Sequence, residues 1–198
     1  MWHTGTGLID PNEVLQRVGI EPGWHVIDLG CGSLGHFTIP AARLVGGVGR
    51  VYAVDIQKPA LRAVERAAKS EQLWNIHPVW SDIERVNAAR IPSDAADLTL
   101  IANTLHQVQH QAGLWQEAVR LTRPGGLILV LEWKNQPTVL GPPLEHRLSL
   151  EDIQSRGIAL ELLVNDVFEA GDHHDAVLFQ KMESNEPQVL STSNPFTV

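Results

Sequence analysis

The chain has 198 residues, of which 43% are hydrophobic and 19% charged, and its formal net charge is −8. This length accommodates one domain with a full core, and the negative charge without any basic run disfavours a nucleic-acid partner. We find no apolar stretch of membrane-spanning length and no signal-peptide pattern, and the single cysteine excludes an internal disulfide. Composition therefore predicts a one-domain cytoplasmic protein without a membrane span.

The N-terminal part of the chain predicts a helix and a buried strand that lead into a glycine-rich turn. Residues 10–19 have the capping residues and apolar spacing of a short helix. Val26–Leu29 is short and mainly apolar, as in a strand that enters a core. Gly30, Gly32 and Gly35 follow at once, where glycine permits a positive φ and leaves room for a ligand beside the main chain.

A second helix and strand follow the glycine-rich turn. Helical spacing resumes at Phe37 and continues to Val45, after which Gly46-Gly47 ends the helix. Val51–Val54 predicts the next buried strand, and Asp55 stands at its carboxyl end. This order is half of a nucleotide-binding βαβ unit, with an acid placed to hydrogen-bond a ribose.

Strand and helix patterns alternate along the rest of the chain, which predicts an open α/β sheet. We expect helices at 59–69, 113–121 and 148–156, and strands at 76–80, 96–102, 127–132, 158–168 and 176–181. Pro124-Gly125-Gly126 is expected to turn the chain into the strand at 127, and the polar turn between the last two strands predicts an antiparallel hairpin. Residues 182–198 are polar and aperiodic, and are expected to form a disordered tail.

The glycine spacing alone does not identify the ligand, but a neighbouring acid narrows the choice. Gly30-x-Gly32-x-x-Gly35 matches the fingerprint of a dinucleotide-binding turn. Asp28, just before the first glycine, would repel a diphosphate and suits a ligand that carries cationic groups. S-adenosylmethionine (SAM) has an ammonium and a sulfonium and no phosphate, so the charge of Asp28 favours SAM.

The segment that begins at Asp28 resembles motif I of the class I SAM-dependent methyltransferases, in which an acid and any residue precede Gly-x-Gly-x-Gly. Asp28, Gly30 and Gly32 match the motif, whereas Leu34 is one extra residue before Gly35. The resemblance covers residues 10–181 and is closest to the small-molecule methyltransferases of ubiquinone and menaquinone biosynthesis. It implies one domain over 1–181, with a Rossmann-like doubly wound sheet of seven strands, mostly parallel with an antiparallel C-terminal strand.

Further cofactor contacts are expected at the carboxyl ends of the strands, where open α/β sheets bind their ligands. Asp55 would accept hydrogen bonds from both ribose hydroxyls, and a solvated helix cap is its alternative. The resemblance implies that Asp82 binds the adenine amino group, and the alternative is that Asp82 only caps a helix. It also implies that Asn103 lies beside the methionine part of SAM, and the alternative is that Asn103 is only a turn residue. The complete set of expected cofactor contacts is Asp28, Gly30, Gly32, Gly35, Asp55, Ile56, Asp82, Ile83 and Asn103.

Histidine and cysteine residues suggest fewer functions. His106 follows Asn103 in a segment that resembles the one relatives place between cofactor and acceptor. It is therefore a candidate to position a substrate oxygen or to accept a proton. A surface histidine that opens the next helix is an equal alternative. His106 and His110 share helical spacing but lack the glutamate and third ligand of a zinc site, so no metal is expected. Residues 172–175 are expected to form a solvated turn. Cys31 has no nearby base and is expected to pack.

Three functions remain open, and the leading one is a SAM-dependent methyltransferase that acts on a small-molecule acceptor. Acceptor selectivity is expected from 103–110, from the loop 134–147, in which Arg147 pairs with an acidic acceptor or a surface acid, and from the N-terminal segment. In that segment Trp2 is a candidate to cover the cofactor, with a frayed terminus as the alternative. A catalytically inactive SAM-binding protein stays open because of the extra residue Leu34. A NAD-type oxidoreductase is opposed by Asp28 and by the lack of a second mononucleotide-binding half.

Overall fold

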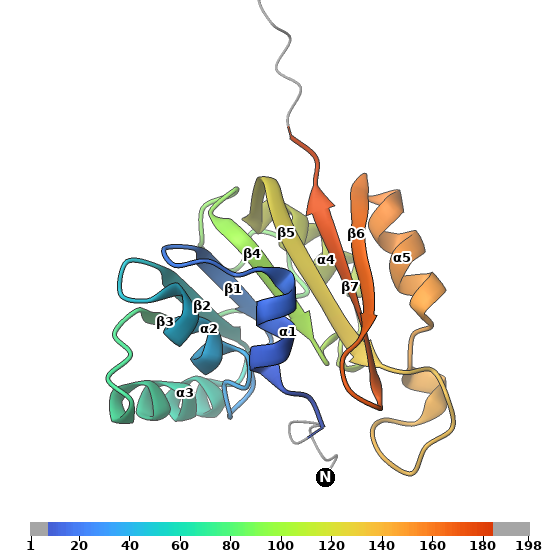
Figure 1. Ribbon diagram of the computed structural model, residues 1–198, viewed down its shortest axis with the longest axis horizontal. Helices are drawn as coiled ribbons and strands as arrows, with labels where there is room; N and C mark the ends of the chain where they lie inside the picture. Colours follow the sequence, from blue (N-terminus) through green and yellow to red (C-terminus); the bar gives the residue numbers. More distant parts are fainter. Residues whose placement is uncertain (1–7, 184–198) are drawn as a thin grey trace, which may run out of the picture.

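The structure is a computed structural model that describes residues 8–183. Trp2 and all but the first two residues of the expected tail at 182–198 lie outside the described residues. Within residues 8–183, seven strands form one sheet (Figure 1) in the order β3-β2-β1-β4-β5-β7-β6. The strands are β1 His25–Leu29, β2 Arg50–Asp55, β3 Ile76–Trp80, β4 Ala96–Ala102, β5 Thr122–Trp133, β6 Leu162–Glu169 and β7 His174–Lys181.

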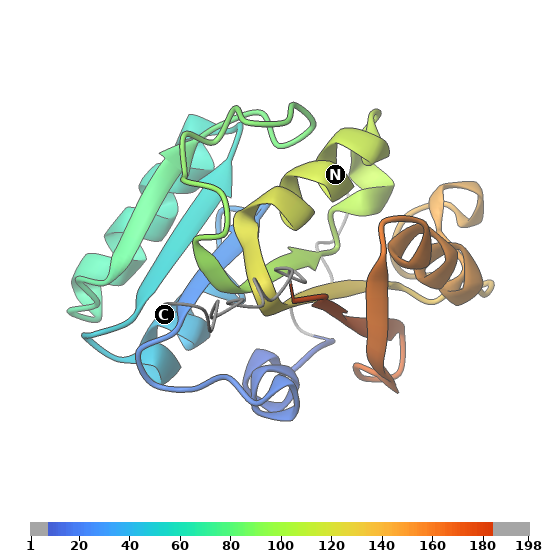
Figure 2. The ribbon, with the colours of Figure 1, turned by 90° about the horizontal axis from the view of Figure 1, so that it is seen from above.

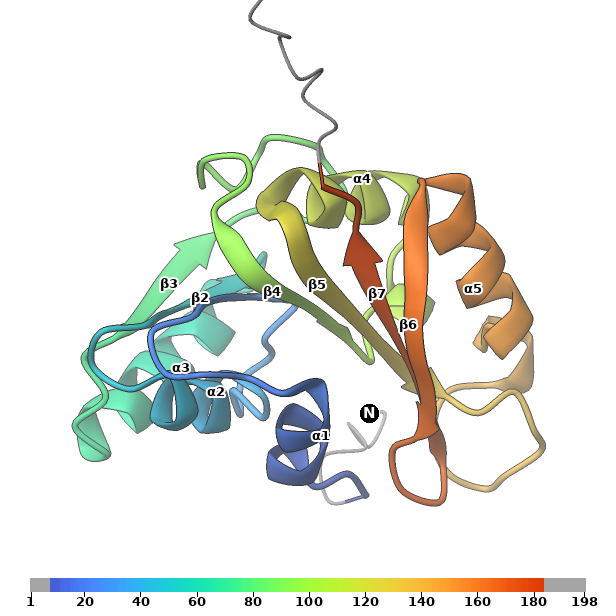
Figure 3. The ribbon, with the colours of Figure 1, turned by 45° about the horizontal axis from the view of Figure 1, so that its top comes forward.

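Helices cover both faces of the sheet, as Figures 2 and 3 show from two further directions. The helices are α1 Pro11–Val18, α2 Thr38–Val45, α3 Lys58–Ser70, α4 Gln111–Leu121 and α5 Leu150–Ala159, with short 3₁₀ turns η1 Leu105–Gln107 and η2 Leu144–His146. The helices α1, α2 and α3 pack on one face and α4 and α5 on the other, so two apolar cores form, one on each side of the sheet. Among the described residues, no helix combines the length and apolar character that crossing a bilayer requires.

The pairing of the strands confirms the predicted fold class. Strands β1 to β5 pair in parallel, and β7 is antiparallel to both β5 and β6. Chain order reverses between β1 and β4, which lie side by side in the sheet. The carboxyl ends of these two strands therefore form the switch point at which such sheets bind ligands.

Local sequence signals explain several of the helix ends. The Asn12 amide donates to Asp10 Oδ1 at 2.8 Å, and Gly19 ends α1 with φ of 79°. The Asp152 amide donates to Ser149 Oγ at 3.0 Å, and the Ser149 amide donates back to the Asp152 carboxylate. This reciprocal capping box starts α5.

The expected turn at Pro124-Gly125-Gly126 is wrong, because α4 passes directly into β5 at Thr122. Ala96 pairs with Thr122 and Leu98 with Leu127, so residues 123–126 bulge out opposite Asp97. Gly125 adopts φ of +74° in this bulge. The glycines therefore absorb extra residues within a strand and do not reverse the chain.

The expected strand at 158–168 begins too early. Ile158 and Ala159 still belong to α5, and the chain turns through Glu161 with φ of 60° before β6 begins at Leu162. The C-terminal hairpin itself is confirmed, because β6 and β7 pair in antiparallel fashion.

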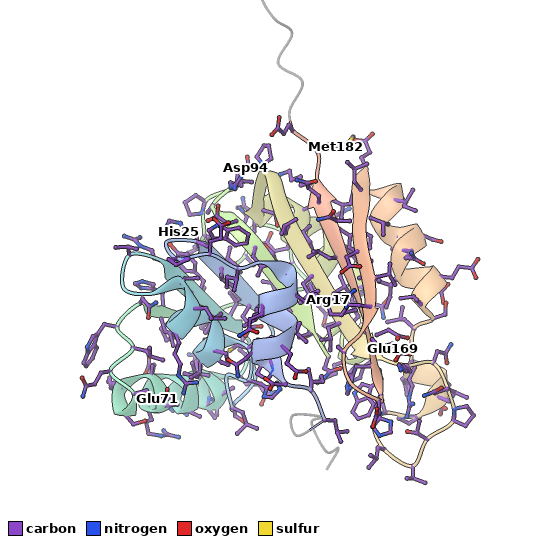
Figure 4. All side chains as sticks on the ribbon, viewed as in Figure 1. Arg17, His25, Glu71, Asp94, Glu169 and Met182 are labelled. Carbon is purple, nitrogen blue, oxygen red and sulfur yellow. The ribbon has the colours of Figure 1, made fainter. Side chains whose placement is uncertain are left out.

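An ion pair joins α1 to the far edge of the sheet. Arg17 projects from α1 toward β6 (Figure 4), where its Nε donates to Asp166 Oδ2 at 2.9 Å. The Arg17 guanidinium also lies 4.4 Å from the centre of the Phe168 ring. In the turn between β6 and β7, a Cβ on Gly171 would lie 2.5 Å from the Leu8 carbonyl oxygen. These contacts hold α1 and the segment before it against β6 and the turn between β6 and β7.

Candidate functional site

A cavity of about 560 Å³ lies at the switch point of the sheet, where β1, β4 and β5 end. The residues that line it come from the glycine-rich turn, from the segment after β4, and from the end of β5 with the loop that follows. They are Asp28, Gly30, Cys31, Gly32, His36, Phe37, Ala102, Asn103, His106, Gln107, Trp133, Pro142, Pro143 and His146. None of these described lining residues is Lys or Arg, so the cavity offers no fixed cation to a phosphate or carboxylate ligand.

The glycine-rich turn is held close to the segment after β4. Gly30 has φ of +87°, and a Cβ at this position would lie 2.7 Å from Thr104 Oγ1, so a larger residue does not fit. Gly35 also has a positive φ, of +56°, which accommodates the extra residue before α2 begins at Thr38. Leu34 itself is 60% exposed and is not part of the cavity lining.

Asp28 supplies a buried carboxyl group to the cavity. It is 2% exposed, and Thr38 Oγ1 donates to its Oδ2 at 2.6 Å. The pKa of Asp28 is raised to about 6, mainly by burial and to a smaller extent by the negative charge of Asp55, while the Thr38 hydrogen bond opposes the rise. A cationic group bound beside Asp28 would therefore gain a partner that the protein has already removed from water.

Asp55 joins the glycine-rich turn to the end of β2. The Gly32 amide donates to Asp55 Oδ2 at 3.0 Å, and the Gln57 amide donates to Oδ1 at 2.7 Å. Each carboxylate oxygen can accept a second hydrogen bond, so the group keeps capacity for a ligand. Asp55 does not line the cavity itself, but Gly32 does. The hydrogen bond from the Gly32 amide therefore connects the Asp55 carboxylate to the cavity wall.

The residues expected around adenine lie outside this cavity. Ile56 is 56% exposed, Ile83 is buried, and Asp82 Oδ1 accepts from the Glu84 amide at 3.1 Å, as in a turn or helix cap. Trp80 Nε1 donates to the Ile56 carbonyl at 2.8 Å, and Lys58 Nζ lies 4.2 Å from the centre of the Trp80 ring. Trp80 is 59% exposed next to Ile56.

Asn103 lines the cavity and carries a buried side-chain oxygen. Its backbone has φ of 53°, and its amide donates to the Leu131 carbonyl at 2.8 Å, which fixes the turn after β4. Within the described residues, its buried Oδ1 has no hydrogen-bond partner. Buried polar atoms without partners are rare, so this oxygen is suited to accept from a ligand donor.

His106 forms a hydrogen-bonded pair with Glu132, which sequence reasoning missed as a site residue. His106 Nδ1 lies 2.7 Å from Glu132 Oε2, and the Leu105 amide donates to Glu132 Oε1 at 2.6 Å. Glu132 is 2% exposed at the end of β5. An acid at the carboxyl end of the strand after β4 is the signal that could have found it. His110 stands at the N-cap of α4 and His106 in η1, so the two do not share one helix face.

The expected solvated turn at 172–175 is wrong for His174, which is fully buried in β7. Its ring centre lies 4.2 Å from the ring centre of Trp133. The pKa of His174 is lowered to about 3, mainly by burial and to a smaller extent by the neighbouring His173, His106 and Arg147. His174 is therefore a neutral packing partner of the cavity wall.

Arg147 organises the loop between β5 and α5, and within the described residues it does not pair with a surface acid. Its side chain is buried and donates to the carbonyl oxygens of Pro142 at 2.9 Å, Gln136 at 2.9 Å and Lys134 at 3.1 Å. The guanidinium also lies 5.6 Å from the centre of the Trp133 ring. The loop that places Pro142, Pro143 and His146 in the cavity wall is thus wrapped around one side chain.

Cys31 also lines the cavity, where burial raises the pKa of its thiol and the nearby Asp28 and Asp55 raise it further. The protonated thiol agrees with the expected packing role. Among the described residues, no three His, Cys, Asp or Glu side chains form a cluster that could hold a metal ion.

The strand order, the glycine-rich turn and the cavity at the switch point together define the fold of the class I SAM-dependent methyltransferases. The family model described as "Methyltransferase domain" matches residues 20–180, so the chain belongs to the methyltransferase domain family. The cofactor of this family of SAM-dependent enzymes is SAM.

Two curated relatives come from quinone biosynthesis. A demethylmenaquinone methyltransferase from a Geobacillus species is 29% identical over 129 residues, which are 65% of this chain and 53% of that protein. A ubiquinone/menaquinone biosynthesis C-methyltransferase from Hydrogenovibrio crunogenus is 33% identical over 119 residues, or 60% of this chain and 46% of that protein. The chain thus spans about half the length of the curated relatives it matches.

Solved structures confirm the fold. A SAM-dependent methyltransferase from Aquifex aeolicus superposes with a TM-score of 0.81 at 24% identity, over 89% of this chain and 92% of that one. A structure described as a type 11 methyltransferase from Sulfolobus solfataricus gives a TM-score of 0.71 at 21% identity, over 90% and 95% of the two chains.

Proposed function

We propose that this protein transfers the methyl group of SAM to a small-molecule acceptor. The observation that carries the proposal is the buried Asp28 carboxyl in a cavity whose described lining residues include no Lys or Arg. Asn103, whose side-chain oxygen has no hydrogen-bond partner among the described residues, lines the same cavity. Both groups accept hydrogen bonds, and they suit the ammonium of the methionine part of SAM. The same cavity is a poor environment for the pyrophosphate of NAD, which disfavours the oxidoreductase.

Asp28, Gly30, Gly32 and Asn103 are proposed to hold the methionine part of SAM. Asp55 would accept from the ribose hydroxyls with the lone pairs that the Gly32 and Gln57 amides leave free.

Ile56, Ile83 and Asp82 are proposed as the adenine site. The exposed side chain of Ile56 supports its role as an apolar wall, and the Trp80 ring beside it extends that surface. Gly35 is also proposed to belong to the cofactor-binding turn, where its positive φ would let the chain enter α2.

SAM supplies an electrophilic methyl group on a positively charged sulfur, so the protein needs only to bind, orient and exclude water. The remaining cavity wall is mainly apolar, with Phe37, Trp133, Pro142 and Pro143. Together with the names of the curated relatives, this lining supports an apolar, ring-containing acceptor such as a quinol.

The domain, partners and location belong to the same proposal. The methyltransferase domain is proposed to extend over 1–181, since α1 packs its Val14, Leu15 and Val18 into the core shared with α2. A net charge of −8 supports a small-molecule acceptor over a nucleic acid, and the single cysteine supports a cytoplasmic location.

Calorimetric titration with SAM and with NAD tests the cofactor, with the Asp55→Ala variant beside the wild type. We expect SAM to bind, NAD to give no heat, and Asp55→Ala to weaken SAM about 10- to 100-fold, since charge-assisted hydrogen bonds are worth about 1.5–3 kcal/mol. Transfer of radiolabelled methyl groups to a panel of quinols, catechols and amines then tests the reaction. Binding of SAM without transfer to any acceptor would favour the inactive SAM-binding protein, and tight NAD binding without SAM binding would overturn the proposal.

A further inference from the structure

We propose that His106 and Glu132 form a catalytic dyad, in which His106 acts as the general base that removes a proton from the acceptor and Glu132 positions the imidazole. The inference rests on the proposed function and adds to it that the methylated atom of the acceptor carries a proton. Its basis is the contact between the two side chains and their place in the cavity wall.

Glu132 fixes which ring nitrogen of His106 carries a hydrogen. Its carboxylate accepts the Leu105 amide hydrogen through Oε1 and faces His106 Nδ1 through Oε2 at 2.7 Å. A carboxylate only accepts hydrogen bonds, so the contact holds the hydrogen on Nδ1 and leaves a lone pair on Nε2. The burial of Glu132, at 2% exposed, removes water that would compete for this contact.

The free nitrogen belongs to a ring that lines the cavity beside Asn103 and Trp133. The His106 side chain retains 11% exposure, and its Nε2 is not among the buried nitrogens without partners. Because Nδ1 faces the protein interior, Nε2 is the nitrogen that a ligand in the cavity can reach. A purely structural role for Glu132 explains the Leu105 contact but does not require the histidine.

The proton balance defines the kind of acceptor. The O–H or acidic C–H bond of the acceptor, or the N–H bond of an ammonium group, breaks and its proton passes to His106 Nε2. The electron pair stays on the acceptor as the nucleophile, which would form the bond to the methyl group of SAM while the methyl–sulfur bond breaks and S-adenosylhomocysteine leaves. The resulting imidazolium lies against the Glu132 carboxylate, which stabilises its positive charge. Acceptors whose reacting atom has no proton, such as thioethers and tertiary amines, would gain nothing from this pair.

The Glu132→Gln variant separates positioning from structural support. Its amide oxygen can still accept from the Leu105 amide, but its NH₂ group would donate to His106 Nδ1 and force the hydrogen onto Nε2. Nitrogen-15 NMR of the histidine rings, on the full chain with S-adenosylhomocysteine, reports this tautomer without any acceptor. We expect the Nδ1–H form in the wild type and the Nε2–H form in Glu132→Gln. An Nε2–H form in the wild type, or no change in the variant, would overturn the inference.

Turnover with an acceptor from the quinol, catechol and amine panel is the second readout. We expect Glu132→Gln and His106→Gln to lower kcat about 100- to 10,000-fold, the usual contribution of a general base, with the dissociation constant of SAM changed less than about twofold. Glu84→Gln is the matched control, because Glu84 accepts from the Gln109 and His110 amides without touching His106, and should leave kcat unchanged.

The outcomes of the turnover experiment are distinct. An unchanged kcat in Glu132→Gln contradicts the inference while the proposed function stands. A wild-type protein that binds SAM but methylates none of the panel contradicts the proposed function, and the tautomer measurement then decides the His106–Glu132 pair alone.

Discussion

At the scale of single residues, Asp28 connects the folded state most directly to ligand binding. Its position just before the first glycine was enough to predict an acid at the mouth of the turn, and the structure places it in the cavity wall. The sequence could not indicate that Thr38 donates to it or how deeply it is buried, because both depend on how α2 returns to the end of β1.

Asp28 should make stability depend on pH. Its pKa of about 6 lies above the ordinary 3.8, so the folded protein binds this proton more tightly than the unfolded chain. The stability that this proton contributes is complete below about pH 4 and is lost as the pH rises through about 6. Asp28→Asn removes the titration, so we expect it to gain about 1–3 kcal/mol of unfolding free energy over the wild type between pH 4 and pH 8.

Urea unfolding of both proteins at the two pH values measures this difference. Asp97→Asn, which removes an acid that is not part of the cavity lining, is the control. A constant difference between Asp28→Asn and the wild type across this range would show that the carboxyl is ionised in the folded protein throughout. The gain should coincide with weaker SAM binding, because the neutral amide cannot compensate the ammonium charge.

The site residues that the sequence predicted differ from those it missed in whether their role depends on tertiary contacts. Asp28, Asn103 and His106 all line the cavity. Asp28 was predicted from its charge beside the glycine-rich turn, whereas Asn103 and His106 were predicted from the resemblance of their segment to that of known methyltransferases. Glu132 was read only as the last residue of a strand, and its role depends on β5 lying beside β4. Arg147 carries no periodic signal, since its partners are the carbonyl groups of its own loop.

At the scale of elements, the packing of α5 on β7 depends on one small residue. Gly157 faces Phe179 so closely that a Cβ would lie 2.2 Å from the ring. Gly157→Ala should cost about 1–3 kcal/mol of unfolding free energy, despite the better helix propensity of alanine, because the ring or the helix must move. Gly47→Ala is the matched control, since a Cβ there meets nothing within 4 Å. Equal thermal melting of both variants would contradict the expected clash.

The loop after β5 makes a second prediction at this scale. Arg147→Ala removes the donors that hold the carbonyl groups of 134–142, so hydrogen exchange of the amides in 134–147 should accelerate. The KM of the acceptor should rise about 10-fold, which corresponds to about 1.4 kcal/mol, while SAM binding changes little. Arg123→Ala, which removes an exposed ion pair with Asp97, is the control. Weaker SAM binding with unchanged acceptor KM would assign the loop to the cofactor instead.

At the scale of the whole molecule, the alternation of strands and helices was sufficient to predict the open sheet and its final hairpin. Predicted element boundaries failed where tertiary pairing overrides local signals, as in the bulge at 123–126, which pairing of Thr122 with Ala96 imposes. The cavity combines segments 28–37 and 102–146, which are far apart in the chain. Only the assembled sheet brings these segments together, so the lining of the cavity could not be read from the sequence.

Because the cofactor contacts connect several strands, SAM should stabilise the whole fold. At a SAM concentration of 100 times its dissociation constant, the unfolding free energy should rise by about 2.7 kcal/mol. For a domain of this size that corresponds to about 5–10 °C in melting temperature. Scanning calorimetry with SAM and with NAD checks the prediction, and the shift should shrink in Asp55→Ala. An equal shift with NAD would count against SAM as the specific ligand.

The position of β7 affects how the chain can assemble during synthesis. This strand lies between β5 and β6, although it follows both in the chain. Until His174–Lys181 leaves the ribosome, β5 has an open apolar edge at Leu127–Leu131 and β6 has no neighbour. An open edge of this kind can pair with another nascent chain. Changes that delay the docking of β7 would therefore lower the yield of folded protein even where the finished molecule is equally stable.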